Sequence, residues 1–196
     1  MNKKNWKKYL KIFFILIIGA FILYSMYIQL EYRGYIKQER ERNYQSLKII
    51  SDHGNNLAGR LEEFVHLPTE EDEVESELYN NWRIVNGESR SIHLYLSTIS
   101  TTHAGDEASD WDLLQFSLFR VDGFISGMTN KFLEDHSYPR SAQENEKMEA
   151  IISLYRTISE EIEKDTIDIE SLLQAIKEDM LIIDDNYSGI LERMGR

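Results

Sequence analysis

A polar stripe on one predicted helix carries the residues best suited to hold a ligand. Arg83, Asn86, Arg90 and His93 follow one another at steps of 3, 4 and 3 residues. Because a helix turns once every 3.6 residues, these four side chains share one face. Neither arginine has an Asp or Glu three or four residues away, so neither can form the usual ion pair within its own helix.

Arg120, on another predicted helix, has no acidic residue three or four positions away either. Two interpretations of these three arginines remain open. They either pair with carboxylates of neighbouring helices or line a groove for an anionic ligand or partner, since arginine binds a carboxylate through two parallel hydrogen bonds. The candidate ligand- or partner-binding residues are therefore Arg83, Asn86, Arg90, His93 and Arg120.

Signatures of catalysis and of cofactor binding are absent from the sequence. It contains no GxSxG, HExxH or GxGxxG motif and no Walker-type phosphate loop. The lack of cysteine excludes disulfides, thiolate zinc sites and iron–sulfur clusters. His103, Asp106 and Glu107 could bind a divalent cation, but such a cluster is also an ordinary helix start. We therefore expect a non-catalytic protein with no metal and no cofactor.

The net charge narrows the choice of partners. The chain has 196 residues, of which 22 are Lys or Arg and 34 are Asp or Glu, so its formal net charge is −12. Affinity for a phosphate backbone comes mainly from Lys and Arg, and a nucleic-acid binder is therefore not expected. The basic residues are also unevenly placed, since five lysines lie within the first eleven residues, where no acidic residue occurs.

Residues 12–30 follow this basic leader and carry no charge. At about 1.5 Å per residue, this stretch is long enough to cross the roughly 30 Å hydrocarbon core of a bilayer. Trp6 and Tyr9 before it and Tyr32 after it fit the aromatic belts of a membrane interface. The sequence predicts a single-pass signal anchor that contacts membrane lipid. A cleaved secretory signal is the alternative, but residues 24–28 include large side chains where a peptidase needs small ones.

The charge on either side of this span predicts its orientation. The positive-inside rule places residues 1–11 in the cytoplasm and residues 31–196 outside the cell membrane. Without the leader, 17 basic residues face 34 acidic ones, which gives the exterior part a net charge of −17. An Ile-, Lys-, Glu- and Asn-rich composition without cysteine is typical of a low-GC bacterium.

The exterior part is predicted to be an antiparallel helical bundle. Apolar residues recur there at steps of three and four, the heptad-like spacing of packed, coiled-coil helices, and not at the step of two that a strand requires. Five such runs span residues 47–64, 78–99, 111–132, 148–162 and 173–194. The fold class is therefore all-α, with one N-terminal transmembrane helix followed by about five helical segments.

Turn and cap residues divide these runs. Pro68 and Pro139 fall between runs, as the missing N–H of proline requires. Ser141 and Glu144 have the spacing of a capping box. Ser109 or Asp110 is the expected cap of the third run, and residues 165–168 separate the fourth run from the fifth.

Glycine positions lead to two further predictions. Gly123 and Gly127 lie one helical turn apart, a spacing that favours the close approach of a neighbouring helix. The membrane helix is expected to continue through residues 33–42 into the first exterior run, with Gly34 as the weak point.

Together these patterns predict a membrane-anchored helical bundle that binds a protein partner, or a second copy of itself, as a scaffold. The alternative is an accessory subunit that senses an anionic ligand between its helices and signals through another membrane protein. Neither the partner nor the oligomeric state follows from the sequence.

Overall fold

The computed structural model describes residues 3–68, 72–102, 104–164 and 167–195, and these residues contain helices and no strand. Two short elements flank the third long helix, the 3-10 helix η1 (Gly105–Glu107) and the π-helix η2 (Asn130–Glu134). The predicted all-α fold class is confirmed. The α-helices are α1 (Lys3–His66), α2 (Asp72–Leu96), α3 (Ala108–Thr129), α4 (Ala142–Ile162), α5 (Ile169–Ala175), α6 (Lys177–Ile183) and α7 (Tyr187–Met194).

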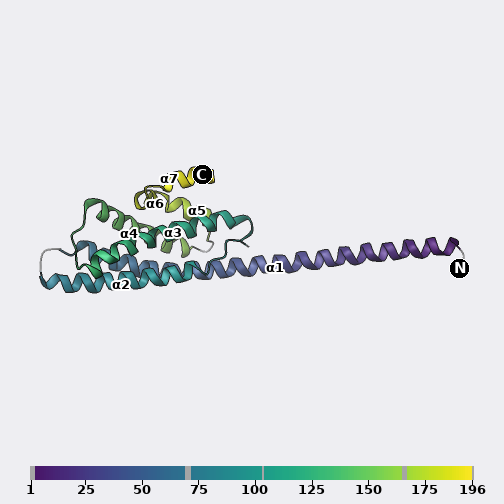
Figure 1. The fold of residues 1–196 in the computed structure, drawn as a ribbon, viewed down its shortest axis with the longest axis horizontal. Coiled ribbons are helices and arrows are strands. Elements are labelled where there is room, and N and C mark those ends of the chain that lie inside the picture. The colour runs from purple at the N-terminus through teal and green to yellow at the C-terminus, as the bar shows by residue number, and fades with distance from the viewer. Residues whose placement is uncertain (1–2, 69–71, 103, 165–166, 196) are drawn as a thin grey trace.

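Helix α1 is a single helix of 64 residues, or about 96 Å at 1.5 Å per residue. Its N-terminal part projects from the bundle with no other element beside it, and Gly34 does not interrupt it (Figure 1). The apolar side chains from Ile12 to Leu30 that the structure describes are exposed, whereas Leu47 and later apolar residues on one face are buried. Among the described helices, α1 alone is long and apolar enough to cross a membrane.

The bundle forms around the C-terminal half of α1. Helix α2 packs back along α1, and α4 packs against α1 as well (Figure 1). Helix α3 lies against α2, while α5 and α6 cover α3 and α4. The first, third and fourth predicted apolar runs fall in α1, α3 with η2, and α4, and the second falls in α2 except for its last three residues, which confirms the predicted helical bundle.

The fifth predicted run is not one helix. Residues 173–194 instead contribute to three short helices, α5, α6 and α7. The side chain of Asp184 accepts a hydrogen bond from the N–H of Asn186 (3.1 Å), which favours a turn at this point over a continued helix. Apolar periodicity was therefore maintained across a turn, because both sides of the turn face the same core.

Most of the predicted helix boundaries are confirmed. Ser141 and Glu144 form both hydrogen bonds of a capping box, and Pro68 and Pro139 lie outside helices. Asp168 caps α5 by accepting a hydrogen bond from the N–H of Glu170. The predicted cap of the third run, Ser109 or Asp110, is wrong by two or three residues, because Glu107 is the N-cap and η1 leads directly into α3 at Ala108.

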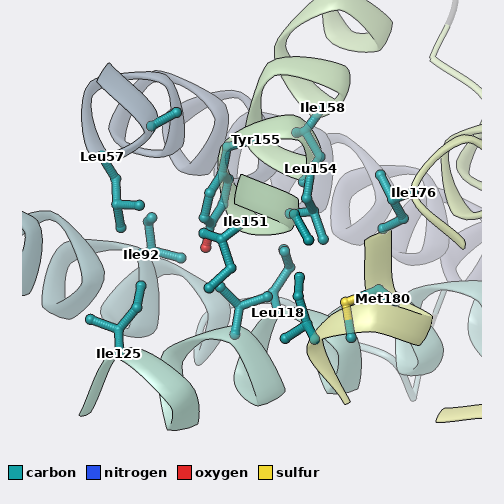
Figure 2. Close-up of a cluster of buried hydrophobic side chains, with 14 of the residues drawn as sticks. Leu57, Ile92, Leu118, Ile125, Ile151, Leu154, Tyr155, Ile158, Ile176 and Met180 are labelled. Carbon is teal, nitrogen blue, oxygen red and sulfur yellow. The ribbon is translucent and has the colours of Figure 1, made fainter. Parts of the chain in front are cut away.

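One continuous apolar core joins these helices, and Figure 2 shows its centre. At one end, the rings of Tyr44 and Trp111 meet edge to face at 5.4 Å. At the other end, Phe132 contacts both Phe64 and Trp82 at ring distances below 5 Å. The labelled side chains at the centre are Leu57 of α1, Ile92 of α2, Leu118 and Ile125 of α3, Ile151, Leu154, Tyr155 and Ile158 of α4, Ile176 at the end of α5, and Met180 of α6.

Close helix approach occurs at a different glycine from those predicted. A Cβ atom added to Gly54 of α1 would lie 2.3 Å from the ring of Tyr155 on α4, so only glycine fits here. By contrast, a Cβ atom on Gly123 or Gly127 would meet nothing within 4 Å, and both residues are exposed. The expectation that this pair seats a neighbouring helix of the chain is wrong.

Candidate functional site

A polar groove of about 270 Å³ lies between α2 and α3. One face of each helix forms its walls, and η2 closes one end. Three of the five residues selected from the sequence line this groove, which we call the α2–α3 groove. Its lining residues are Asn86, Ser89, Arg90 and His93 from α2, Asp122, Ser126 and Thr129 from α3, and Asn130 and Glu134 from η2.

Asp122 organises one part of the groove. Its Oδ1 accepts a hydrogen bond from the Ser89 hydroxyl (2.7 Å), and its Oδ2 lies 2.8 Å from Nδ1 of His93. Because an ionised carboxylate only accepts hydrogen bonds, Nδ1 carries the proton in this pair. The His93 ring also meets the edge of Phe119, with ring centroids 5.2 Å apart. The imidazole is therefore held in one orientation, with Nε2 left to accept a hydrogen bond from a ligand.

A second set of hydrogen bonds ties the two walls together nearer η2. The indole N–H of Trp82 donates to the Thr129 hydroxyl (3.3 Å). That hydroxyl lies 2.8 Å from the carbonyl oxygen of Ile125 and 3.3 Å from Oδ1 of Asn86. These contacts fix Asn86 at the groove wall and leave its amide NH₂ group as a donor.

The charges of the groove are mixed. Arg90 forms no ion pair or hydrogen bond with any residue that the structure describes, and its side chain is exposed. Its guanidinium can therefore bind a carboxylate through two hydrogen bonds. Asp122 and Glu134 add two carboxylates to the same groove. A bound group must combine an acceptor for Arg90 with donors, so a simple anion is a poor match.

The other two predicted residues lie outside the groove. Arg83 is exposed on α2, seven residues before Arg90, and forms no interaction with the described part of the chain. Arg120 is bound elsewhere: its Nε and Nη2 donate to the two carboxylate oxygens of Asp184 at 2.9 and 3.0 Å. For Arg120, the structure shows the cross-bundle pairing that the sequence left open.

The Arg120–Asp184 pair has a clear electrostatic effect. The Asp184 side chain is almost fully buried, and burial alone would raise its pKa. Hydrogen bonds from Arg120 and from the Asn186 N–H, with the charges of Arg120 and Lys147, outweigh burial and hold the pKa of Asp184 below its usual range. This arginine stabilises the turn before α7 and is not available to a ligand.

Sequence reasoning missed the wall that α3 provides. Asp122, Ser126 and Thr129 follow one another at steps of 4 and 3, the same spacing that identified the stripe on α2. This signal could have been found by searching each predicted helix for a polar stripe beside its apolar seam. Which two stripes face each other could not, because that depends on how the helices pack.

The groove presents hydrogen-bond donors and acceptors of both charges. In the described part of the chain, no hydroxyl is hydrogen-bonded to His93. His103 lies outside the described residues, and those residues contain no cluster of three His, Asp or Glu side chains that could hold a metal ion. No protein-family model, curated protein or solved structure matches this chain.

Proposed function

We propose that this protein is a single-pass membrane protein whose exterior bundle binds a partner protein through the α2–α3 groove and does not act as a catalyst. Residues 12–30 span the membrane, residues 1–11 are cytoplasmic and residues 31–196 are extracytoplasmic. The exposed apolar part of α1 supports the anchor, and the five leader lysines support the orientation.

The observation that carries the binding proposal is the unpaired Arg90 beside a fixed imidazole. Arg90 and His93 lie one turn apart on α2, and Asp122 holds the His93 ring in place. Arg83 lies about 10 Å further along the same helix and is also unpaired within the described residues. In a domain with a net charge of −17, these two arginines are cationic groups on α2 that an acidic group of a partner can reach. A partner segment would place a carboxylate on Arg90 and a donor on His93.

Photocrosslinking in the cell that makes the protein tests this interaction. A benzophenone amino acid replaces Ser126, which lines the groove, or Glu149, which is exposed on α4 and serves as the matched control. We expect one discrete protein adduct from position 126, loss of that adduct in Arg90→Ala and partial recovery in Arg90→Lys. Equal adducts from both positions, or an adduct that Arg90→Ala leaves unchanged, would contradict binding in the groove.

The absence of cysteine allows a clean test of orientation. Asn2→Cys and Glu149→Cys each introduce a single thiol into the full chain. A membrane-impermeant maleimide should label Glu149→Cys in intact cells and Asn2→Cys only after lysis. The reverse pattern would place the bundle inside the cell.

The size of the groove favours a second candidate function, an accessory sensor for a small carboxylate-bearing ligand. A volume of about 270 Å³ approaches the roughly 300 Å³ at the lower end of small-molecule sites. A saturable rise in melting temperature on addition of such a compound, absent in Arg90→Ala, would favour the sensor. An unchanged rise in Arg90→Ala would exclude the groove as its site.

A further inference from the structure

The start of α2 and the segment between η2 and α4 lie at the end of the bundle farthest from the N-terminus of α1 (Figure 1), and residues of both line a second cavity of about 340 Å³. Glu75, Ser76 and Tyr79 from the start of α2 form one side of it, and His136 and Tyr138 from the segment between η2 and α4 form the other. It shares no lining residue with the α2–α3 groove. We call it the tip cavity.

Aromatic rings with fixed positions dominate the tip cavity. The rings of Tyr79 and His136 stack at 5.5 Å with an angle of 13° between their planes. Tyr138, which is only 5% exposed, stacks on the core residue Phe132 at 6.0 Å and 9°. The hydroxyl of Tyr138 is 3.5 Å from Nδ1 of His136, which links the two stacks. The cavity therefore offers an aromatic surface whose geometry is set by the core.

Glu75 supplies the negative charge of the tip cavity. Its Oε1 lies 3.8 Å from Nδ1 of His136, and its side chain remains about half exposed. The two nearest basic residues of the η2–α4 segment are both engaged elsewhere. Lys131 binds Glu144, and the Arg140 guanidinium donates to backbone carbonyls at the C-terminal end of α1. Among the residues that the structure describes, no lysine or arginine lines the cavity to neutralise Glu75.

The backbone at His136 is unusual in a way that concerns this cavity. Its φ of 48° lies in the left-handed region, and among the described residues no other non-glycine residue has a positive φ. Such a conformation is strained for a residue with a side chain and persists where the surroundings impose it. Hydrogen bonds from Asp135 N–H to Asn130 O and from Ser137 N–H to Lys131 O hold the segment on either side. The strained residue is the one whose ring stacks on Tyr79.

We propose that the tip cavity binds an organic ammonium group, with the cation against the tyrosine rings and Glu75 as its counter-ion. An aromatic face attracts a cation through its negative quadrupole, and this attraction strengthens when the cation is desolvated. Glu75 disfavours an anionic ligand, and its carboxylate, about half exposed and 3.8 Å from Nδ1 of His136, can serve as the counter-ion of a cation. The site is independent of the function proposed for the α2–α3 groove.

Two probes separate the possible sources of such a group. Choline carries a trimethylammonium group that cannot donate an N–H hydrogen bond, and Nα-acetyl-lysine methylamide carries a primary ammonium group that can. Each is titrated into the full chain in uncharged maltoside micelles, with its tyrosines labelled with ¹³C and followed by NMR. We expect saturable shifts of the Tyr79 and Tyr138 resonances. A response to choline alone assigns a quaternary amine, and a response to the lysine derivative alone assigns a lysine side chain.

Four variants test whether the rings and the carboxylate hold the cation. Tyr79→Leu and Glu75→Gln should each weaken binding about tenfold, whereas Tyr79→Phe, which keeps the ring, should bind normally. Tyr95→Leu is the matched control, because Tyr95 also stacks on a histidine, His53, at 6.0 Å but lines neither cavity. It should bind like the wild type.

Three outcomes would overturn the proposal. The first is no saturable shift with either probe. The second is equal weakening in Tyr95→Leu, and the third is unchanged binding in Tyr79→Leu with loss in Glu75→Gln, which indicates simple attraction to an acidic surface. If Tyr79→Leu fails to fold, Glu75→Gln and the wild-type spectra decide together: the proposal stands only if Glu75→Gln weakens binding and the Tyr79 and Tyr138 ring resonances themselves shift saturably with the probe.

Discussion

Two helix–helix contacts of the bundle differ in chemistry. At Gly54, helices α1 and α4 meet through an apolar contact in which Tyr155 leaves no room for a side chain, while Arg156 donates to Asn55 at the exposed edge of the same helix pair. Tyr155 is fully buried, and burial raises its pKa. Helices α2 and α3 meet partly through hydrogen bonds, such as those between Asp122 and its partners Ser89 and His93, and a groove remains between them.

From this difference we expect the stability of the bundle and the proposed binding to depend on different helix–helix contacts. An apolar contact packed against glycine gains stability from shape and leaves no volume for a ligand. A hydrogen-bonded contact gains less, because each net hydrogen bond contributes about 1 kcal/mol, but it leaves donors and acceptors at a surface. Substitutions at the two contacts should therefore separate unfolding free energy from binding.

The largest effect is expected at the α1–α4 contact. Gly54→Leu forces a side chain into the space of the buried Tyr155 ring, and overpacking of this kind should lower the free energy of unfolding by about 3 kcal/mol. Urea unfolding of the full chain in maltoside micelles, followed by the fluorescence of buried Trp82 and Trp111, measures the change.

Gly59, on the same helix, provides the control for Gly54. A Cβ atom there would lie 3.9 Å from the end of the flexible Arg156 side chain. Gly59→Ala should therefore stabilise the protein by about 0.5–1 kcal/mol through helix propensity. If Gly54→Leu were as stable as the wild type, the α1–α4 contact would not be the rigid one.

A smaller effect is expected at the Arg120–Asp184 pair. Asp184→Asn removes a charge that accepts two hydrogen bonds from Arg120, and it should lower stability by about 2 kcal/mol at neutral pH. Because the pKa of Asp184 is lower in the folded state than its ordinary value of 3.8, the charge stabilises the fold above that value. The difference between wild type and variant should therefore vanish as pH falls through the folded-state pKa.

The exposed Asp185 is the matched control for Asp184. Asp185→Asn removes only a surface contact with Lys147 and should change stability by less than about 0.5 kcal/mol. A difference at Asp184 that stayed constant as the pH falls further and further below 3.8 would show that its effect is not electrostatic.

A still smaller change is expected within the α2–α3 contact. Ser89→Ala removes one hydrogen bond to Asp122 and should lower the free energy of unfolding by about 1 kcal/mol. His93 still holds the carboxylate, so the groove should keep most of its crosslinking. A loss above 3 kcal/mol in the same urea assay would make this contact as critical as α1–α4 and remove the contrast.

The smallest change in stability is expected at Arg90. Its side chain is exposed and has no partner among the described residues, so Arg90→Ala should change the free energy of unfolding by less than about 0.5 kcal/mol. The same variant should lose the crosslink from position 126. Urea unfolding of Arg90→Ala tests the first expectation, and crosslinking tests the second. A clear loss of stability would give Arg90 a structural role.

Much of the fold follows from the sequence, because local rules set it. The steps of three and four predict the long helices, and Ser141 with Glu144 marks the start of α4. The division of residues 173–194 into three helices does not follow, since its apolar spacing runs across the turn at Asp184. The role of Gly54 does not follow from the sequence either, because only the packed structure places Tyr155 against it.

The candidate site is predicted in part. Asn86, Arg90 and His93 are found from their spacing on one helix, which is local information. The separation of Arg120 from them depends on Asp184, 64 residues further along the chain. Pairing between distant residues decides which arginines remain able to bind a ligand. The residue spacing along a single helix does not reveal such pairing.

The unbroken path of α1 has a mechanical consequence. With no loop between its exposed apolar stretch and the bundle, the direction in which the α2–α3 groove faces is set by a residue count. One residue inserted near Gly34 would turn the whole bundle by about 100° around the helix axis, and four would return it to within about 40° of its original azimuth. The number of residues in the helix therefore sets the orientation of the bundle. Binding to a partner fixed beside the helix would rise and fall with the number of inserted residues, with the period of the helix.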